Sequence, residues 1–351
     1  MKHVSIKDVA RVAHVSHPTV SRALRKSPLV NPETAERIRQ IADTMGYRAN
    51  AVARGLVTQK TWTIGAVVTT IADPFIGEVV SGVEELANDK GYSVILANCN
   101  ADPERELRVV RLFQERRVDG ILVLSSRVGA LYMPLLSELK VPIVLINSHH
   151  PDQFAHSVMI DNLGGTVAAV NHLIRLGHRR IAYVGDQYGL QSDTERFAGY
   201  RQALMLADYP FVPELVVHAN GKADGSAPAV NRLLALESPP TAVFCYNDAT
   251  AIGALRALRV HGLRVPEHVS VVGFDDLALA SYTEPPLTTV RQPKQQMGRM
   301  AVEILCNLLA GAQEQTQIKV PGELIIREST SPPHVSKIAP LAVPKDLIPS
   351  R

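Results

Sequence analysis

Residues 5–24 read SIKDVARVAHVSHPTVSRAL, and this stretch has the pattern of two short helices joined by a tight turn. Ser5 precedes an apolar face at helical spacing and has Asp8 at the third position of the helix, which is the arrangement of a capping box. Ser16 begins the second helix, where Pro18 is tolerated because the first N–H groups of a helix have no intrahelical partner. The stretch therefore predicts a helix-turn-helix, whose second helix has the size to enter the ~12 Å wide major groove of DNA.

A third helix and a strong local charge complete this N-terminal segment. Asn31 and Pro32 mark the start of the third helix, and Gly46 marks its predicted end. Residues 1–60 contain eleven Lys and Arg against four Asp and Glu, a net charge of +7. Because the whole chain carries +3, the remaining residues carry −4. A basic head on a slightly acidic body favours a polyanionic partner for the head.

The start of the second helix carries the side chains that we expect to meet DNA. Arg22 has the reach and the fork geometry to bind O6 and N7 of guanine. His17 and Ser21 are further candidate base readers, and Pro18 can offer only shape and apolar contact. Hydroxyl groups near the helix starts are suited to phosphate oxygens, together with the N–H groups there. The candidate phosphate contacts are Ser5, Ser16 and Thr19.

Residues 48–56, RANAVARGL, follow the head and admit two interpretations. The first is a plain linker, because so short a segment does not form a stable isolated helix in water. The second is a hinge segment that becomes helical only when two copies pair, and that inserts Leu56 as an apolar wedge into a minor-groove base step. In the second case Asn50 and Ala53 join Leu56 as candidate DNA contacts.

From residue 63 onward the pattern changes to apolar strands that alternate with amphipathic helices. Apolar runs at 63–70, 120–124 and 141–146 are separated by other elements, and the same order recurs from about residue 180. This alternation predicts parallel sheets with crossover helices, arranged as two similar α/β units in tandem. Ligands of such sheets sit outside the carboxyl ends of the strands, in the cleft between the units.

Polar side chains follow the apolar runs at the positions where such a cleft would lie. Carboxylates and amides accept hydrogen bonds from the hydroxyl groups of a polyhydroxylated ligand, a guanidinium donates to its oxygens, and an aromatic ring packs on a sugar face. A capped helix or a satisfied turn is the alternative for each residue. The candidate effector contacts are Asp73, Phe75, Ser126, Asn147, Asp161, Arg196, Asn247, Asp248 and Asp275.

Several separate motifs occur in one order along residues 4–329. Those of the head and hinge are Ile6-Lys7-Asp8-Val9-Ala10, Val15-Ser16, Thr19-Val20-Ser21-Arg22, Gly46-Tyr47 and Ala51-Val52-Ala53-Arg54-Gly55-Leu56. Those of the body include Arg117-Val118-Asp119-Gly120-Ile121, Asp161-Asn162, Gly177-His178-Arg179-Arg180-Ile181, Arg196-Phe197-Ala198-Gly199-Tyr200, Asn247-Asp248 and Gly273-Phe274-Asp275. With these motifs the chain resembles the LacI/GalR family of bacterial transcription regulators.

The resemblance implies an N-terminal all-α helix-turn-helix head on an α/β periplasmic-binding-protein-like core of two parallel-sheet subdomains. It implies a homodimer that binds a pseudo-palindromic operator in double-stranded DNA, with a small-molecule effector controlling the affinity. Family members use the matching Arg and Asp in the effector pocket, which favours Arg196 and Asp275 most. Some purine-sensing members carry an aromatic residue after the fourth strand, where this chain has Asn147 and Ser148. That departure favours a sugar or polyol over a nucleobase, while induction and co-repression stay open.

The resemblance and the element order together give a predicted division of the chain. The segments are a head at 1–47, a hinge at 48–61, a core at 62–329 and a flexible Pro-rich tail at 330–351. Within the core, the first subdomain takes about 62–160 plus 292–318, and the second takes about 161–291 plus 319–329.

Other functional classes find little support in the sequence. Phosphate-binding loops, nucleophile elbows and zinc-protease motifs are missing, so we expect neither catalysis nor a cofactor. Cys99, Cys245 and Cys306 are too far apart for a disulfide framework or a zinc site. His149 and His150 lie in a Pro-containing loop without a metal-binding partner, so we expect no metal there.

The remaining alternative is a sugar-binding transport receptor with the same core fold. Against it, the N-terminus has no signal-peptide pattern, and no run approaches the ~18 apolar residues that a membrane span requires. We therefore expect a soluble, cytoplasmic regulator, most simply a repressor.

Overall fold

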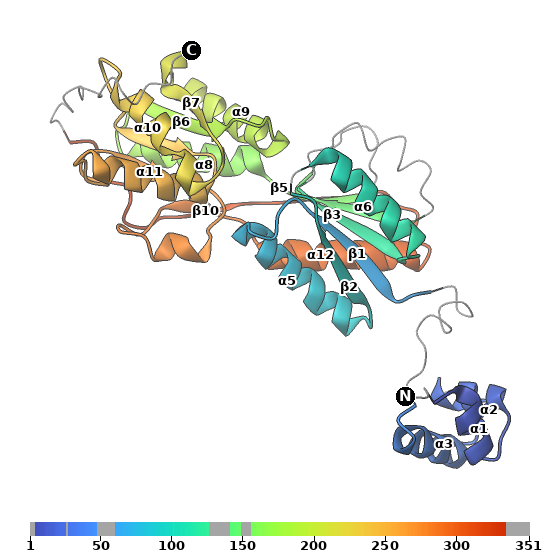
Figure 1. Ribbon diagram of the computed structural model, residues 1–351. Helices are drawn as coiled ribbons and strands as arrows, with labels where there is room; N and C mark the ends of the chain where they lie inside the picture. Colours follow the sequence, from blue (N-terminus) through green and yellow to red (C-terminus); the bar gives the residue numbers. More distant parts are fainter. Residues whose placement is uncertain are drawn as a thin grey trace. The chain divides into compact units, whose positions relative to one another are not determined.

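The computed structural model describes residues 4–25, 27–47, 60–100, 102–125, 141–148 and 156–334. The chain divides into two compact units, Met1–Trp62 and Thr63–Arg351. Figure 1 shows the helical head in dark blue and the larger α/β core in colours that run from lighter blue to red. None of the helices in the described part of the chain combines the length and apolarity that crossing a bilayer requires.

The head consists of three helices, α1 (Ile6–Val12), α2 (His17–Leu24) and α3 (Pro32–Thr44). Ser5 and Asp8 form the predicted capping box of α1, and Ser16 accepts a hydrogen bond from the backbone N–H of Thr19 at the start of α2. Asn31 caps α3 in the same way, with Pro32 as its first residue. The three caps confirm the predicted helix starts because each depends only on residues within one turn.

The apolar faces of the three head helices meet in a small core. Val9, Val20 and Ile38 are completely buried there, one from each helix. A core of this size gives only modest stability to a domain of about 45 residues. Its role is to hold α2 with its outer face open to solvent.

The first subdomain of the core has a six-stranded sheet in the order β11-β5-β4-β3-β1-β2, and its strand pairs are parallel. Its strands are β1 (Thr63–Val68), β2 (Ser93–Asn98), β3 (Gly120–Leu124), β4 (Ile143–Ile146), β5 (His156–Ile160) and β11 (Thr316–Val320). Its helices are α5 (Pro74–Asp89), α6 (Pro103–Glu115) and α12 (Lys294–Leu309).

The second subdomain has a four-stranded parallel sheet in the order β7-β6-β8-β9. Its strands are β6 (Ile181–Asp186), β7 (Val216–Ala219), β8 (Ala242–Cys245) and β9 (Ser270–Val272). Its helices are α8 (Asn162–Arg175), α9 (Gln191–Leu206), α10 (Ala227–Leu234) and α11 (Asp248–Val260). Short 3₁₀ turns occur at Pro213–Leu215, Ala223–Gly225 and Ala278–Ser281.

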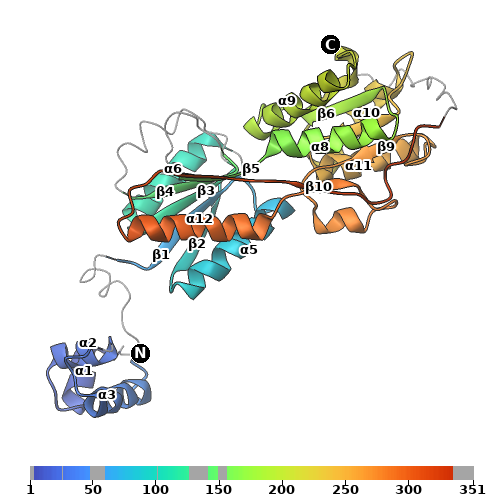
Figure 2. The same cartoon turned by 180° about the vertical axis from the view of Figure 1, so that it is seen from behind.

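Three segments join the two subdomains. The first leads from β5 into α8, and the other two include β10 (Thr289–Arg291) and β12 (Glu323–Ile325), which pair antiparallel. In Figure 2 the dark red C-terminal segment runs from the first subdomain to the second. Crossing segments of this kind hold two units together while leaving a cleft between the ends of their sheets.

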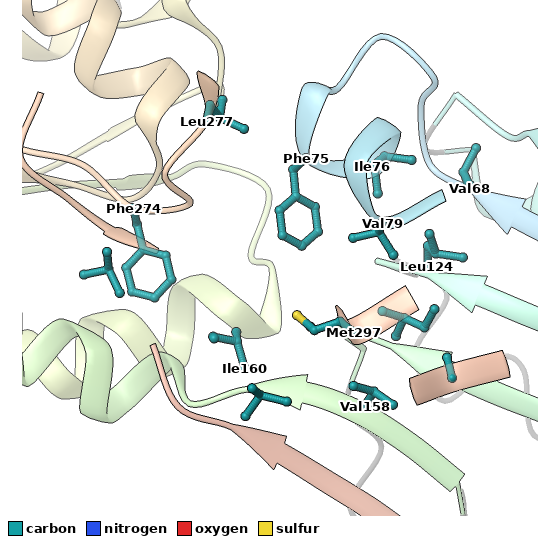
Figure 3. Close-up of a cluster of buried hydrophobic side chains, with 14 of the residues drawn as sticks. Val68, Phe75, Ile76, Val79, Leu124, Val158, Ile160, Phe274, Leu277 and Met297 are labelled. Carbon is teal, nitrogen blue, oxygen red and sulfur yellow. The ribbon is translucent and has the colours of Figure 1, made fainter. Parts of the chain in front are cut away.

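Helices α5 and α12 lie against each other on the first subdomain, and two glycines permit the contact. A Cβ atom on Gly82 would overlap the carbonyl group of Gln295, and one on Gly298 would overlap the carbonyl oxygen of Val79. Figure 3 shows the apolar cluster beneath these helices, where Val79 of α5 and Met297 of α12 lie close to Leu124 of the sheet. The two helices therefore form one tightly packed layer.

The structure corrects one predicted boundary. The predicted tail begins too early at 330, because Thr330 hydrogen-bonds to His172 over 3.0 Å and the carbonyl oxygen of Ser331 lies 2.9 Å from His178 Nε2. These contacts join positions more than 150 residues apart, which local composition does not reveal.

Candidate functional site

A cavity of about 600 Å³ lies at the carboxyl ends of the strands, lined by both subdomains of the core. This is where ligands of open α/β sheets bind. Six of the nine predicted effector residues line it: Asp73, Phe75, Asn147, Arg196, Asn247 and Asp275. The first three come from the first subdomain and the others from the second, so the cavity brings together residues that are far apart in the sequence.

Arg196 is the centre of the polar network in this cavity. Its side chain is only 2% exposed, and its Nε donates to Asn162 Oδ1 over 2.9 Å while its Nη1 donates to the carbonyl oxygen of Tyr246 over 2.6 Å. Its guanidinium carbon lies 3.7 Å from the ring centre of Phe274 and 4.7 Å from that of Tyr246. These contacts fix the guanidinium in one orientation before any ligand arrives.

Asp275 faces Arg196 from the turn that follows β9. Its Oδ1 lies 3.6 Å from Arg196 Nη2 and accepts a hydrogen bond from Gln292 Nε2 over 2.6 Å. Burial raises the pKa of the Asp275 carboxyl above its ordinary value, against the lowering effect of the Arg196 and Lys294 charges. Its φ angle of 118° is a conformation that few non-glycine residues adopt. A strained, buried carboxylate beside a fixed guanidinium is typical of a functional site.

Asp73 and Phe75 come from the start of α5 on the other side of the cavity. Asp73 caps the helix by accepting from the backbone N–H of Phe75 over 2.9 Å, and burial raises its pKa. Phe75 is 6% exposed. Figure 3 shows Phe75 on the first-subdomain side and Phe274 and Leu277 on the second-subdomain side. The helix cap thus also places a carboxylate and an aromatic ring at the cavity.

Two asparagines complete the predicted set. Asn147 follows β4 with a φ angle of 52°, which asparagine tolerates better than most residues. Asn247 caps α11 by accepting from the backbone N–H of Thr250 over 2.8 Å, and its Nδ2 donates to the carbonyl oxygen of Gly221 over 3.0 Å. Asn147 follows β4 directly, and Asn247 follows β8 with one residue, Tyr246, between them.

Two predicted effector residues do not line the cavity, and a third lies outside the described residues. Asp161 caps α8 by accepting from the backbone N–H of Gly164 and forms a 3.0 Å ion pair with Lys319, so it does not line the cavity. Asp248 is completely buried behind the lining, where it accepts from the backbone N–H of Leu277 over 2.7 Å. Ser126 lies outside the described residues.

Asp248 gives a prediction about stability and pH. Burial, and secondly the negative charge of Asp275, raise the pKa of the Asp248 carboxyl well above its ordinary value of 3.8. Above about pH 4 the unfolded chain loses this proton while the folded protein keeps it, so ionisation lowers the stability of the fold as the pH rises. Asp248→Asn keeps a neutral side chain that can accept from Leu277 and donate to Thr289. We expect the Tm of Asp248→Asn to decrease less than that of the wild-type protein as the pH rises from 5 to 8.

The measurement is thermal unfolding across that pH range, with Asp89→Asn as the control because Asp89 is an exposed carboxylate on α5. An Asp248→Asn curve parallel to that of the wild-type protein at all pH values would contradict the assignment.

The cavity also contains residues that the sequence analysis missed. Asp186 ends β6 and is 3% exposed, and the rule of a polar residue after an apolar run would have found it. Gln292 has no such signal, because it lies in a crossing segment. Its Nε2 donates to Asp275, while its buried Oε1 has no hydrogen-bond donor among the described residues. Further missed lining residues are Tyr188, Ser192, Asn220 and Tyr246.

On the head, the predicted DNA contacts lie around the start of α2. His17, Pro18 and Arg22 are exposed, and the side chain of Arg22 has no hydrogen-bond or ion-pair partner among the described residues. Ser21 Oγ accepts from Arg25 Nη2 over 2.6 Å, which leaves its own hydrogen free to donate to a base.

The hydroxyls predicted to bind phosphate serve as helix caps here: Ser5 Oγ pairs with Asp8, and Ser16 Oγ lies 2.8 Å from Thr19 Oγ1. Asn50, Ala53 and Leu56 lie outside the described residues, as do His149 and His150.

Comparisons with known proteins cover both parts of the chain. Residues 5–50 match the model of bacterial regulatory proteins of the lacI family, and residues 170–330 match the periplasmic binding protein-like domain. Two similar relatives are the HTH-type transcriptional repressor PurR of Aliivibrio fischeri and the HTH-type transcriptional regulator RegA of Clostridium saccharobutylicum. PurR is 36% identical over 93% of this chain and 98% of its own length, and RegA is 37% identical over 93% and 99%.

Solved structures give the same result. The lac repressor dimer bound to operator and the anti-inducer ONPF matches with a TM-score of 0.86 and 27% identity, over 94% of this chain and all of that one. The CelR–cellobiose complex matches with a TM-score of 0.71 and 33% identity, over 93% of this chain and all of that one. These matches confirm the predicted fold of a helix-turn-helix head and a periplasmic-binding-protein-like core. The chain therefore belongs to the lacI family of bacterial regulatory proteins and is a transcriptional regulator.

Proposed function

We propose that this regulator is a homodimeric repressor whose head binds a pseudo-palindromic operator and whose core binds a neutral, sugar-like effector. The observation that carries the effector assignment is the polar lining of the cavity. Carboxylates of Asp73, Asp186 and Asp275 and amides such as Asn247 surround the buried Arg196, and Phe75 adds an aromatic ring. Groups of these kinds bind sugar hydroxyls by accepting and donating hydrogen bonds while the ring packs on a sugar face.

The charges of the cavity favour a neutral effector over an anionic one. Arg196 is already bonded to Asn162, to Tyr246 and to the Asp275 carboxylate, so its donors are largely used. A phosphate or carboxylate group would meet three carboxylates at close range, and the exposed Lys222 at the lining offers a mobile charge only. Like charges at such range repel strongly in a buried site.

The relatives support the same proposal from their own names and titles. One solved structure is of CelR in complex with cellobiose, and another is of a LacI family regulator of Enterococcus faecium, 26% identical with a TM-score of 0.68, with bound ribose. The lac repressor forms a dimer on its operator. By analogy this chain pairs two heads on two half-sites, and its action on bacterial DNA places it in the cytoplasm.

A transport receptor with the same core fold is the alternative. Against it stands the head at residues 5–50, which matches a DNA-binding family and carries exposed basic and polar groups on α2. Salt-dependent retention on DNA separates the two functions. A DNA-binding head releases counterions from the duplex when it binds, so its affinity falls as the salt concentration rises, whereas a transport receptor does not bind DNA.

The experiment for the effector class is a thermal-shift screen on the full chain. The panel contains D-glucose, D-galactose, D-ribose and cellobiose, with glucose 6-phosphate and guanine as anionic and nucleobase controls. A sugar at 100 times its Kd adds about 2.7 kcal/mol to the stability of the native state, which raises Tm by several degrees. Stabilisation by glucose 6-phosphate or guanine alone would refute the neutral-sugar assignment.

A further inference from the structure

Lys294, the first residue of α12, carries a buried positive charge that the sequence analysis did not single out. Its side chain is 3% exposed. Its Nζ donates to the carbonyl oxygen of Asp275 over 2.7 Å and to that of Asp276 over 2.8 Å, and it lies 3.3 Å from Glu78 Oε2. Two of the three N–H donors of the ammonium group are thus hydrogen-bonded, and Glu78 supplies the opposing charge. A buried charge without such partners would cost several kcal/mol.

The partners of Lys294 belong to different subdomains. Glu78 is on α5, which packs on α12 through the close approach at Gly82 and Gly298 in the first subdomain. Asp275 and Asp276 form the turn that follows β9 in the second subdomain. One ammonium group therefore ties the α5–α12 layer to a turn on the other side of the cleft.

The backbone of this turn is strained, and Lys294 adds to the bonds that hold it, among them the 2.8 Å hydrogen bond from the Asp275 N–H to the carbonyl oxygen of Val290. Asp275 and Asp276 have φ angles of 118° and 51°, and both conformations are costly for residues with a side chain. In this conformation the two carbonyl oxygens converge on Lys294 Nζ, while the Asp275 side chain points to Gln292 and Arg196 at the cavity. The same residue thus presents its backbone to Lys294 and its carboxylate to the effector site.

We propose that Lys294 is a positioning residue for effector recognition, which holds the Asp275 carboxylate in place by bonding the backbone of its turn to the α5–α12 layer. The proposal rests on the assignment of the cavity as the effector site. It gives a physical route from the cleft to the first subdomain: a shift of the α5–α12 layer relative to the second subdomain pulls on the backbone of a residue that binds the effector.

The first test needs no ligand. Hydrogen exchange is measured on the full-length protein for the amide of Asp275, which donates to the carbonyl oxygen of Val290 over 2.8 Å. Lys294→Met removes the donors and keeps an apolar stem. We expect at least tenfold faster exchange at this amide and unchanged exchange in α6 and in the head.

Arg299→Met is the matched control. Arg299 also joins α12 to α5, through a 3.0 Å ion pair with Glu85, but it does not touch the turn. We expect its effect on the Asp275 amide to stay within twofold. Glu78→Gln is the second variant, in case Lys294→Met does not fold, because Glu78 is partly exposed and we expect its substitution to leave the fold intact. Without the compensating charge, the buried ammonium holds the turn less well, so we expect at least threefold faster exchange.

The second test uses the sugar panel described above. The thermal shift given by the stabilising sugar should fall at least threefold in Lys294→Met and stay unchanged in Arg299→Met. In an Asp275→Asn background, Lys294→Met should add little, because residues that act through one another are not additive.

The outcomes separate the two proposals. If no sugar stabilises the wild-type protein, the effector class is wrong, and the exchange experiment still decides the role of Lys294. If exchange at Asp275 is unchanged in both Lys294→Met and Glu78→Gln, or is equally raised in Arg299→Met, the positioning role is overturned.

Discussion

Arg196→Ala should abolish the response to the effector and lower the free energy of unfolding by about 3–5 kcal/mol, the usual cost of breaking a buried charge pair from one side. The substitution leaves the Asp275 carboxylate without its facing guanidinium and removes the donors to Asn162 and Tyr246. Loss of a buried, hydrogen-bonded charge partner weakens binding by about 2–5 kcal/mol, which is roughly 30-fold or more. We therefore expect Arg196→Ala to lower the affinity for the effector more than the substitution of any exposed residue of the lining does.

Urea unfolding and effector titration measure the two effects separately, at a temperature where the variant remains folded. Arg201→Ala is the control, because Arg201 lies on the same helix and is exposed. Its guanidinium carbon lies 5.4 Å from the ring centre of Phe211. We expect this control to lose less than about 1 kcal/mol. A folded Arg196→Ala protein that responds with the wild-type midpoint would remove Arg196 from the effector site.

Arg22→Ala should weaken binding to the operator by about 1–3 kcal/mol and relax the preference for one base pair. Arg22 is exposed on α2 and its side chain is free of described partners, so its fork of donors is available to the O6 and N7 atoms of guanine. The operator is first obtained by selection from random duplexes. Binding to it and to a scrambled duplex is then followed by fluorescence anisotropy.

Arg11→Ala is the control for charge alone, since Arg11 is an exposed arginine of the same head that pairs with Asp8 on α1. The control should affect both duplexes about equally. If Arg22→Ala also weakens both duplexes equally, with a salt slope reduced by about one, Arg22 contacts phosphate and does not read a base.

Features that depend on neighbouring residues were predictable from the sequence. The caps at Ser5, Ser16 and Asn31 depend on residues within one helical turn. The alternation of strands and helices follows from the spacing of apolar residues along the sequence. The carboxyl ends of strands gather at one edge of a parallel sheet, which explains why Asp73 and Asn247 reach the same cavity.

The fate of an individual polar residue after a strand was harder to predict, because it depends on partners from distant parts of the chain. Asp73 and Asp161 occupy equivalent capping positions, yet only Asp73 also lines the cavity, whereas Asp161 is paired with Lys319 on β11. Asp248 follows β8 closely, yet its carboxylate turns inward to the backbone of Leu277. The sequence around Asp161 or Asp248 does not reveal which distant residue each side chain contacts.

The position of α12 in the chain has a consequence for the order in which the core is completed during synthesis. Met297, Ala301 and Leu305 of this helix are fully buried in the cluster that covers the first sheet. Strands β1 to β5 leave the ribosome first, but the whole sheet of the second subdomain, up to Val272, is made before α12 appears. The first subdomain thus begins first and is finished last. The part of its apolar face that α12 covers stays uncovered while residues 161–293 are made, and in that interval it is accessible to chaperones or to aggregation.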